Sequence, residues 1–146
     1  MLLGPLLAGA VAIASADASE YRDAVSVAPG FQEKEARTPA QRKINSQLLY
    51  EIYRRRGEAQ KKGVPPGPTD VRIDKVGRAL VDVRAEVTPA IEKKIRDLGG
   101  VVISTSSRDQ SILARIPILK LERLAGDPAV HAIEPAAEAM TNRPKR

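Results

Sequence analysis

The clearest alternation of apolar and polar positions lies in the middle of the chain, at residues 81–87. Every second residue there is apolar and the residues between are charged: Val81, Val83, Ala85 and Val87 alternate with Asp82, Arg84 and Glu86. A period of two is typical of a strand with one buried face. The pattern therefore predicts a strand that turns its aliphatic side chains to a core and its three charged side chains to the opposite face.

The residues that follow predict a complete small domain. Thr88 and Pro89 suit the start of a helix, and Gly99 and Gly100 suit its end. The further elements, separated by turn residues, are a helix at 89–98, strands at 101–105 and 112–116, a helix at 121–125 and a strand at 130–133. This order of strand, helix, strand, strand, helix, strand predicts an α+β fold of the ferredoxin-like type, with two helices on one face of a four-stranded antiparallel sheet. We expect the domain to span residues 70–139.

A longer amphipathic helix is predicted before this domain, within residues 38–63. Thr38 and Gln41 match a capping box, with a proline between them, and apolar residues then recur at helical spacing up to Ile52. Gly63 is expected to end the helix near Lys62. We expect this helix to be separable from the domain, and residues 19–37, which show no period, to form a linker.

The first residues favour a signal peptide over 1–18. Residues 2–13 are apolar but too short to span a bilayer, and small residues follow at Ala14, Ala16 and Ala18 in the spacing of a cleavage site. This predicts a secreted or periplasmic protein with no stable membrane insertion after signal removal. No basic residue precedes the apolar run, so a misassigned start or an unstructured apolar tail stays an alternative.

Composition narrows the function classes that a ferredoxin-like domain serves. RNA recognition on such a sheet needs aromatic side chains, and the four aromatic residues all precede residue 70: Tyr21, Phe31, Tyr50 and Tyr53. We therefore expect no nucleic-acid partner, although the net charge is +6. The chain has no cysteine to supply thiolates, and we expect no metal and no cofactor. The basic runs 54–56 and 61–62 are interpreted as a solvated helix face, with an anionic partner as the alternative.

Catalytic chemistry is not expected in this chain. His131 is the single histidine, and it falls in the last predicted strand with no nucleophile paired to it. Glu134, beside Pro135, is interpreted as the end of that strand rather than as a general acid. Without a base beside a nucleophile there is no acyl-transfer machinery, and we predict that this chain is not itself an enzyme.

The second half of the domain carries a distinctive series of short motifs. In chain order these are Ile116-Pro117, Leu121-Glu122-Arg123-Leu124-Ala125, Asp127-Pro128, Val130 and Ile133-Glu134-Pro135. The series resembles the propeptides of the subtilisin family, in which a Leu-x-x-Leu-Ala helix ends at a proline and the last strand leads toward the protease. The resemblance covers about half of the chain, from near Asp70 to Pro135. The helix at 39–62 and the segment before it also resemble the N-terminal lead of some secreted bacterial subtilases.

This resemblance implies a domain that binds, chaperones and inhibits a subtilisin-like serine protease. It implies that the sheet face with Asp82, Arg84 and Glu86 packs on the protease. It also implies an inhibitory tail that lies in the active-site cleft, formed by Ala136, Ala137, Glu138, Ala139 and Met140. A disordered tail is the alternative for this segment, and residues 143–146 are less suited to the cleft because Pro144 restricts the backbone and removes a donor.

Two versions of this function stay open. In one, the chain is the N-terminal part of a secreted subtilase, and the longer parent is a serine endopeptidase. In the other, it is a free-standing inhibitor that acts in trans. A ferredoxin-like interaction or ligand-sensing module unrelated to proteolysis is the alternative from a different class.

Overall fold

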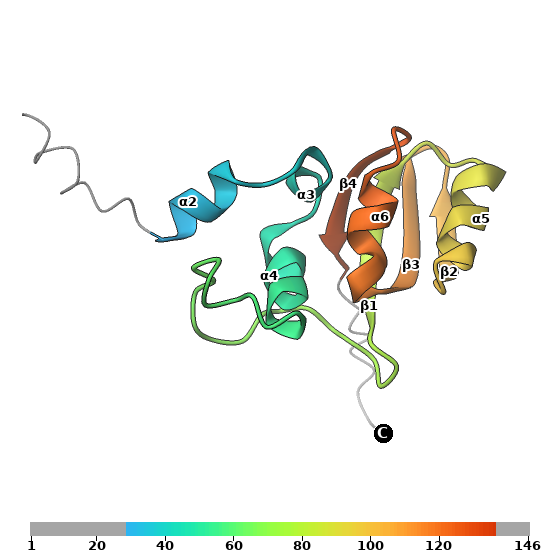
Figure 1. Cartoon of the computed structure of the whole chain (residues 1–146). Helices are drawn as coiled ribbons and strands as arrows, with labels where there is room; N and C mark the ends of the chain where they lie inside the picture. Colours follow the sequence, from blue (N-terminus) through green and yellow to red (C-terminus); the bar gives the residue numbers. More distant parts are fainter. Residues whose placement is uncertain (1–28, 137–146) are drawn as a thin grey trace, which may run out of the picture.

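The computed structural model describes residues 29–136, and a four-stranded antiparallel sheet forms the centre of this part of the chain (Figure 1). The strands are β1 Arg78–Ala85, β2 Val101–Ser106, β3 Ser111–Pro117 and β4 Val130–Pro135. Their spatial order is β2-β3-β1-β4, and all neighbouring pairs are antiparallel. The prediction of an α+β fold of the ferredoxin-like type is confirmed.

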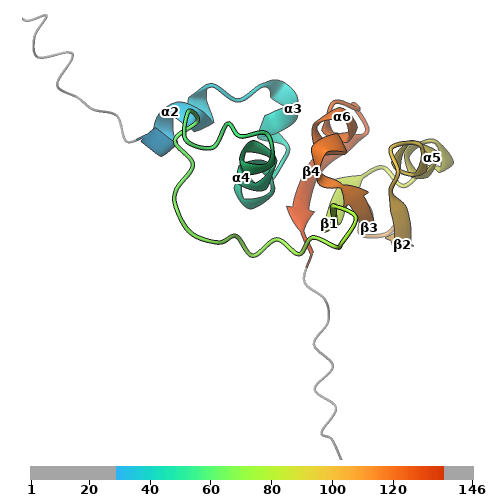
Figure 2. The same cartoon turned by 60° about the horizontal axis from the view of Figure 1, so that its bottom comes forward.

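Two helices that connect strands of the sheet lie together on one of its faces (Figure 2). They are α5 Pro89–Asp97 and α6 Leu121–Ala125, the latter directly preceded by the short 3-10 helix η1 Ile118–Lys120. The Thr88 hydroxyl accepts a hydrogen bond from the Ile91 N–H at 3.3 Å and so caps α5, as the sequence predicts. Gly99 has a φ of +88°, which lets the chain turn sharply out of α5 into β2.

The core between these helices and the sheet consists of aliphatic side chains. Alternate residues of the strands point into it, because successive side chains of a strand face opposite ways. The fully buried members from the sheet and α6 are Ala79, Val81, Val83, Ala85, Ile112, Ala114, Ile116, Leu121, Leu124, Ala125, Val130 and Ile133. Leu124, in the Leu-x-x-Leu-Ala motif of α6, is thus part of the core against the sheet.

The predicted single helix from Pro39 to Lys62 is wrong, because the chain leaves the helical conformation twice. The capping box of Thr38 and Gln41 is present, but it opens only the four-residue helix α3 Pro39–Arg42. Helix α4 Ser46–Arg55 starts anew with Asn45 as its N-cap. Its last residue, Arg55, lies well before Lys62. Gly57 follows two residues later with a φ of +73°, the left-handed conformation common just after helix ends.

The break between α3 and α4 has a tertiary cause at the edge of the sheet. The Ile133 N–H donates to the Lys43 carbonyl at 2.8 Å, and the Asn45 N–H donates to the Ile133 carbonyl at 2.9 Å. Ile44 lies between these bonds in a parallel bridge with Ile133. Three residues of the helical segment therefore cover the outer edge of β4, and this gain of backbone hydrogen bonds outweighs the local helical pattern.

Helix α4 belongs to the same hydrophobic core as the sheet. Ile44 and four residues of α4, namely Leu48, Leu49, Ile52 and Tyr53, are buried in one cluster with the strands. Figure 1 shows α4 beside β4, and α4 contacts both β4 and η1. The expectation of a separable helix is therefore not matched by the packing, which has no boundary between residues 44–53 and the sheet.

The prediction of a linker over residues 19–37 is wrong for the residues of this range that the structure describes. Residues Pro29–Glu35 form helix α2. The predicted signal peptide at 1–18 lies outside the described residues, and so do residues 137–146. Within residues 29–136, no helix has the length and apolar character needed to cross a membrane.

Candidate functional site

The face of the sheet opposite α5 and α6 is the surface on which the predicted site residues lie. Asp82 and Arg84 alternate with the buried residues of β1, so they point away from the core. Asp82 stands opposite Leu113 of β3 and Glu134 of β4 in the ladder. Glu86 is exposed one residue beyond the end of β1. The structure thus brings Asp82 and Arg84 together on this face, hereafter the free face, with Glu86 at its margin.

The polar groups at the centre of the free face bind one another. Arg84 Nη2 lies 3.1 Å from Asp82 Oδ2, and Arg84 Nη1 is 3.4 Å from the Asp109 carbonyl oxygen. The Ser111 hydroxyl donates a hydrogen bond to Asp82. Asp109 in turn accepts from the hydroxyl of Ser106 at 2.7 Å. The charges of Asp82 and Arg84 are therefore compensated within the domain.

The β2 side of the free face has a different chemistry. Val101 and Ile103 are 47% and 49% exposed, although they are large aliphatic residues in a strand. The register shifts between Val102 and Ser104, which makes Ile103 the extra residue of a bulge. Strand β2 carries no charged residue. Leu113, opposite Ser104 on β3, extends this aliphatic character inward from the edge.

The predicted inhibitory tail begins at the other edge of the sheet. The Ala136 N–H donates to the Leu80 carbonyl at 3.1 Å, so the chain is still held to β1 at this point. Ala136 also lines an open hollow of about 590 Å³, together with Asn45, Gln47 and Val71. The remaining tail residues Ala137, Glu138, Ala139 and Met140 lie outside the described residues.

The residues that sequence analysis set aside as catalytic candidates lie on the surface of β4. His131 and Glu134 are both exposed. In the described part of the chain, no three residues among His, Cys, Asp and Glu form a group that could hold a metal ion.

A buried polar cluster between α2 and α4 was not predicted from the sequence. The Glu33 carboxylate is bound by Arg37 through two contacts of 2.7 Å, and it accepts a hydrogen bond from the Tyr53 hydroxyl at 3.3 Å. The hydrogen bond to Glu33 raises the pKa of Arg37, and burial is the main cause that raises the pKa of Tyr53 to about 12. The i,i+4 spacing of Glu33 and Arg37 is the signal that could have indicated it.

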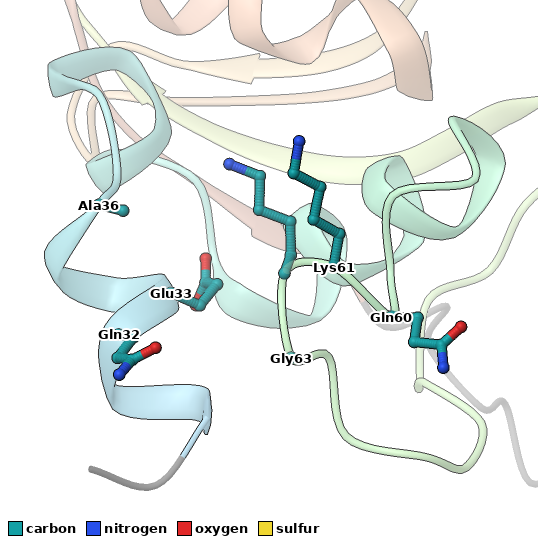
Figure 3. A pocket seen from close by; sticks show the side chains of 7 residues that line it. Gln32, Glu33, Ala36, Gln60, Lys61 and Gly63 are labelled. Carbon is teal, nitrogen blue, oxygen red and sulfur yellow. The ribbon is translucent and has the colours of Figure 1, made fainter. Parts of the chain in front are cut away.

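This cluster adjoins a hollow of about 330 Å³ between α2 and the turn at 60–63 (Figure 3). Figure 3 shows Gln32 and Glu33 on its α2 wall, with Gln60, Lys61 and Gly63 across from them. The carboxylate of Glu33 is already neutralised by Arg37, so the cluster holds α2 against α4 and offers no free charge to a ligand.

Comparison with known proteins adds no relative to this description. No protein-family model matches the chain, and neither do the curated proteins or the solved structures that were searched.

Proposed function

We propose that this chain is a propeptide-type domain that binds a subtilisin-like serine protease, assists its folding and inhibits it. The observation that carries the proposal is the pairing of a sheet face that α5 and α6 leave uncovered with a last strand, β4, that lies at one edge of the sheet and ends at Pro135, directly before the predicted tail. A face of this kind suits a large protein surface, and a segment that leaves the edge of a sheet suits a cleft on the same partner.

The proposed division of labour follows from this arrangement. The sheet supplies contact area, and residues 136–140 occupy the active-site cleft in the manner of a bound product. The proposed partner is a protein and not a nucleic acid, since the four strands carry no Phe, Tyr or Trp to stack a base. The protease acts as a ligand that binds only the folded domain, so it also stabilises the fold, by about 2.7 kcal/mol at a hundredfold excess over Kd.

Inhibition of a panel of bacterial subtilisins tests the proposal. We expect the full chain to slow hydrolysis of a chromogenic peptide by at least one of these enzymes. The same enzyme, blocked at its serine, should raise the melting temperature of the chain. If a broad panel gives neither inhibition nor thermal stabilisation, the proposal is overturned. An interaction module unrelated to proteolysis is then the favoured alternative.

Two shortened chains separate the tail from the sheet. A chain that stops after Met140 keeps the proposed tail and should inhibit like the full chain. A chain that stops after Ala136 loses the tail but keeps every described residue, so it should still bind while inhibiting at least tenfold less strongly. Equal inhibition by both chains would remove residues 137–140 from the proposed role.

A further inference from the structure

The polar centre of the free face is poorly suited to carry binding energy. Asp82 already has Arg84 and Ser111 as partners, and Arg84 also reaches the Asp109 carbonyl. A partner that covers these groups removes water from a compensated ion pair and gains little attraction in return. Charges of this kind, when they lie in an interface, set orientation more than affinity.

The aliphatic residues of β2 have the opposite property. Val101 and Ile103 each leave about half of their surface in water, and burying aliphatic surface yields about 25 cal/mol per Å². Their strand carries no charge of its own, and the charged residue opposite Val101 in the ladder is Arg115 of β3. The other large aliphatic residues that are well exposed in the described chain, Val76 and Leu119, lie outside the sheet.

The position of β2 relative to the predicted tail indicates which partner would cover Val101 and Ile103. The predicted tail follows β4 in the chain, and β2 is the opposite edge of the same sheet. Three strand spacings, about 14 Å, separate the two edges. A single protein surface that holds the tail and also reaches β2 must cover the whole free face between them, and contact at both edges fixes its orientation.

We propose that Val101 and Ile103 are the anchor residues through which the domain binds its protease, and that the protease surface opposite them is apolar. This inference rests on the proposed function. It moves the energetic centre of the interface from Asp82, Arg84 and Glu86, the residues that the sequence indicated, to the edge strand β2. The three charged residues then form the polar surroundings of the anchor.

Threonine substitutions at the anchor provide the test. Val101→Thr combined with Ile103→Thr keeps β-branched side chains in the strand while making both positions polar. We expect this double variant of the full chain to have an inhibition constant at least tenfold weaker against a subtilisin that the parent chain inhibits. Melting temperatures of the free chains, parent and variant, check that the fold is unchanged.

Two controls make the result specific. Val76→Thr changes a valine that is 70% exposed but lies outside the sheet, so its inhibition constant should stay within threefold of the parent. Arg84→Ala, in the polar surroundings of the anchor, should weaken inhibition less than the double variant does. The inference is overturned if the parent inhibits while the double variant inhibits equally well, or if Arg84→Ala causes the larger loss. If the parent inhibits no subtilisin, the proposed function itself falls, which is a different and separately recognisable outcome.

Discussion

The helical segment at 29–63 and the sheet part at 64–136 differ in composition but share one core. The helical segment has nine basic and four acidic residues, against eleven and ten in the sheet part, so most of the excess positive charge lies in the helices. It also supplies Tyr53, the buried aromatic residue of a core that is otherwise aliphatic. The difference teaches that a change in composition and a Pro-rich connection at 64–68 do not mark a boundary in packing.

The largest expected effect follows from dividing the two regions. A chain that begins at Val64 lacks the five core side chains contributed by residues 44–53. At about 1.5–3 kcal/mol for each buried side chain, the loss approaches the whole stability of a domain, about 5–15 kcal/mol. We expect this fragment to be unfolded in isolation, as measured by circular dichroism and thermal melting.

The control removes only residues 1–27 and leaves the core side chains in place. A chain that begins at Ala28 retains every described residue and should melt cooperatively. A fragment from Val64 that melts like this control would contradict the shared core and restore the two regions as independent units.

One buried leucine in each region allows the contributions of the two regions to the stability of the fold to be compared. Leu49 in α4 and Leu124 in α6 are both fully buried, and each should lose about 2–5 kcal/mol of unfolding free energy on substitution by alanine. Leu119→Ala, at a position that is about half exposed, should cost far less. Urea denaturation measures all three. A nearly silent Leu49→Ala beside a costly Leu124→Ala would show that α4 is only loosely attached.

Two ion pairs with the same i,i+4 spacing sharpen the comparison further. Glu33 and Arg37 in the helical segment are almost completely buried, whereas Lys93 and Asp97 in α5 are largely exposed. Removing one partner of a buried pair leaves an uncompensated charge, so we expect Glu33→Ala to cost about 3 kcal/mol. Lys93→Ala should cost about 0.5 kcal/mol or less. Equal costs in urea denaturation would mean that water reaches Glu33.

The sheet and its two helices could be predicted because their signals are local. The alternation at 81–85, the Thr88 cap and the glycines after α5 each act within a few residues, and the structure follows them. The break between α3 and α4 could not be predicted in this way. Its cause is a pair of hydrogen bonds to Ile133, which is far from Lys43 and Asn45 in sequence.

The candidate site was predictable only in part, for a similar reason. Period-two alternation places Asp82 and Arg84 on the free face, and they lie there. The sequence does not reveal that Ser111 and Asp109 already satisfy them, because those contacts depend on the β1–β3 register. The exposure of Val101 and Ile103 was missed as well. A run of β-branched residues has the same pattern in a buried strand as in an edge strand, so strand order decides between them.

The smallest expected effect concerns Glu122, the polar link between the two regions. Its carboxylate accepts a hydrogen bond from Gln41 at 2.8 Å and lies 2.9 Å from Arg56, and both partners belong to the helical segment. Burial acts to raise the pKa of Glu122, but the bonds from Arg56 and Gln41 outweigh it, and the pKa is lowered from its ordinary value of 4.5. The contribution to stability is therefore present above about pH 4.5 and is lost as the pH falls through the lower pKa of the folded state.

Glu122→Gln tests this link, because glutamine resembles the protonated carboxyl. We expect the variant to be about 1 kcal/mol less stable than the parent at pH 7, as for a partly exposed ion pair. The difference should shrink as the pH falls from 4.5 through the lower pKa of the folded state, because the parent then carries a neutral side chain at this position as well. Urea denaturation at pH 7, 5 and 3.5 measures the difference, and the carboxylates common to both proteins cancel in it. Asp97→Asn, which breaks the exposed pair in α5, serves as the control and should show a small difference at every pH. A gap between Glu122→Gln and the parent that is absent at pH 7 would mean that the charge of Glu122 does not join the helical segment to the sheet part.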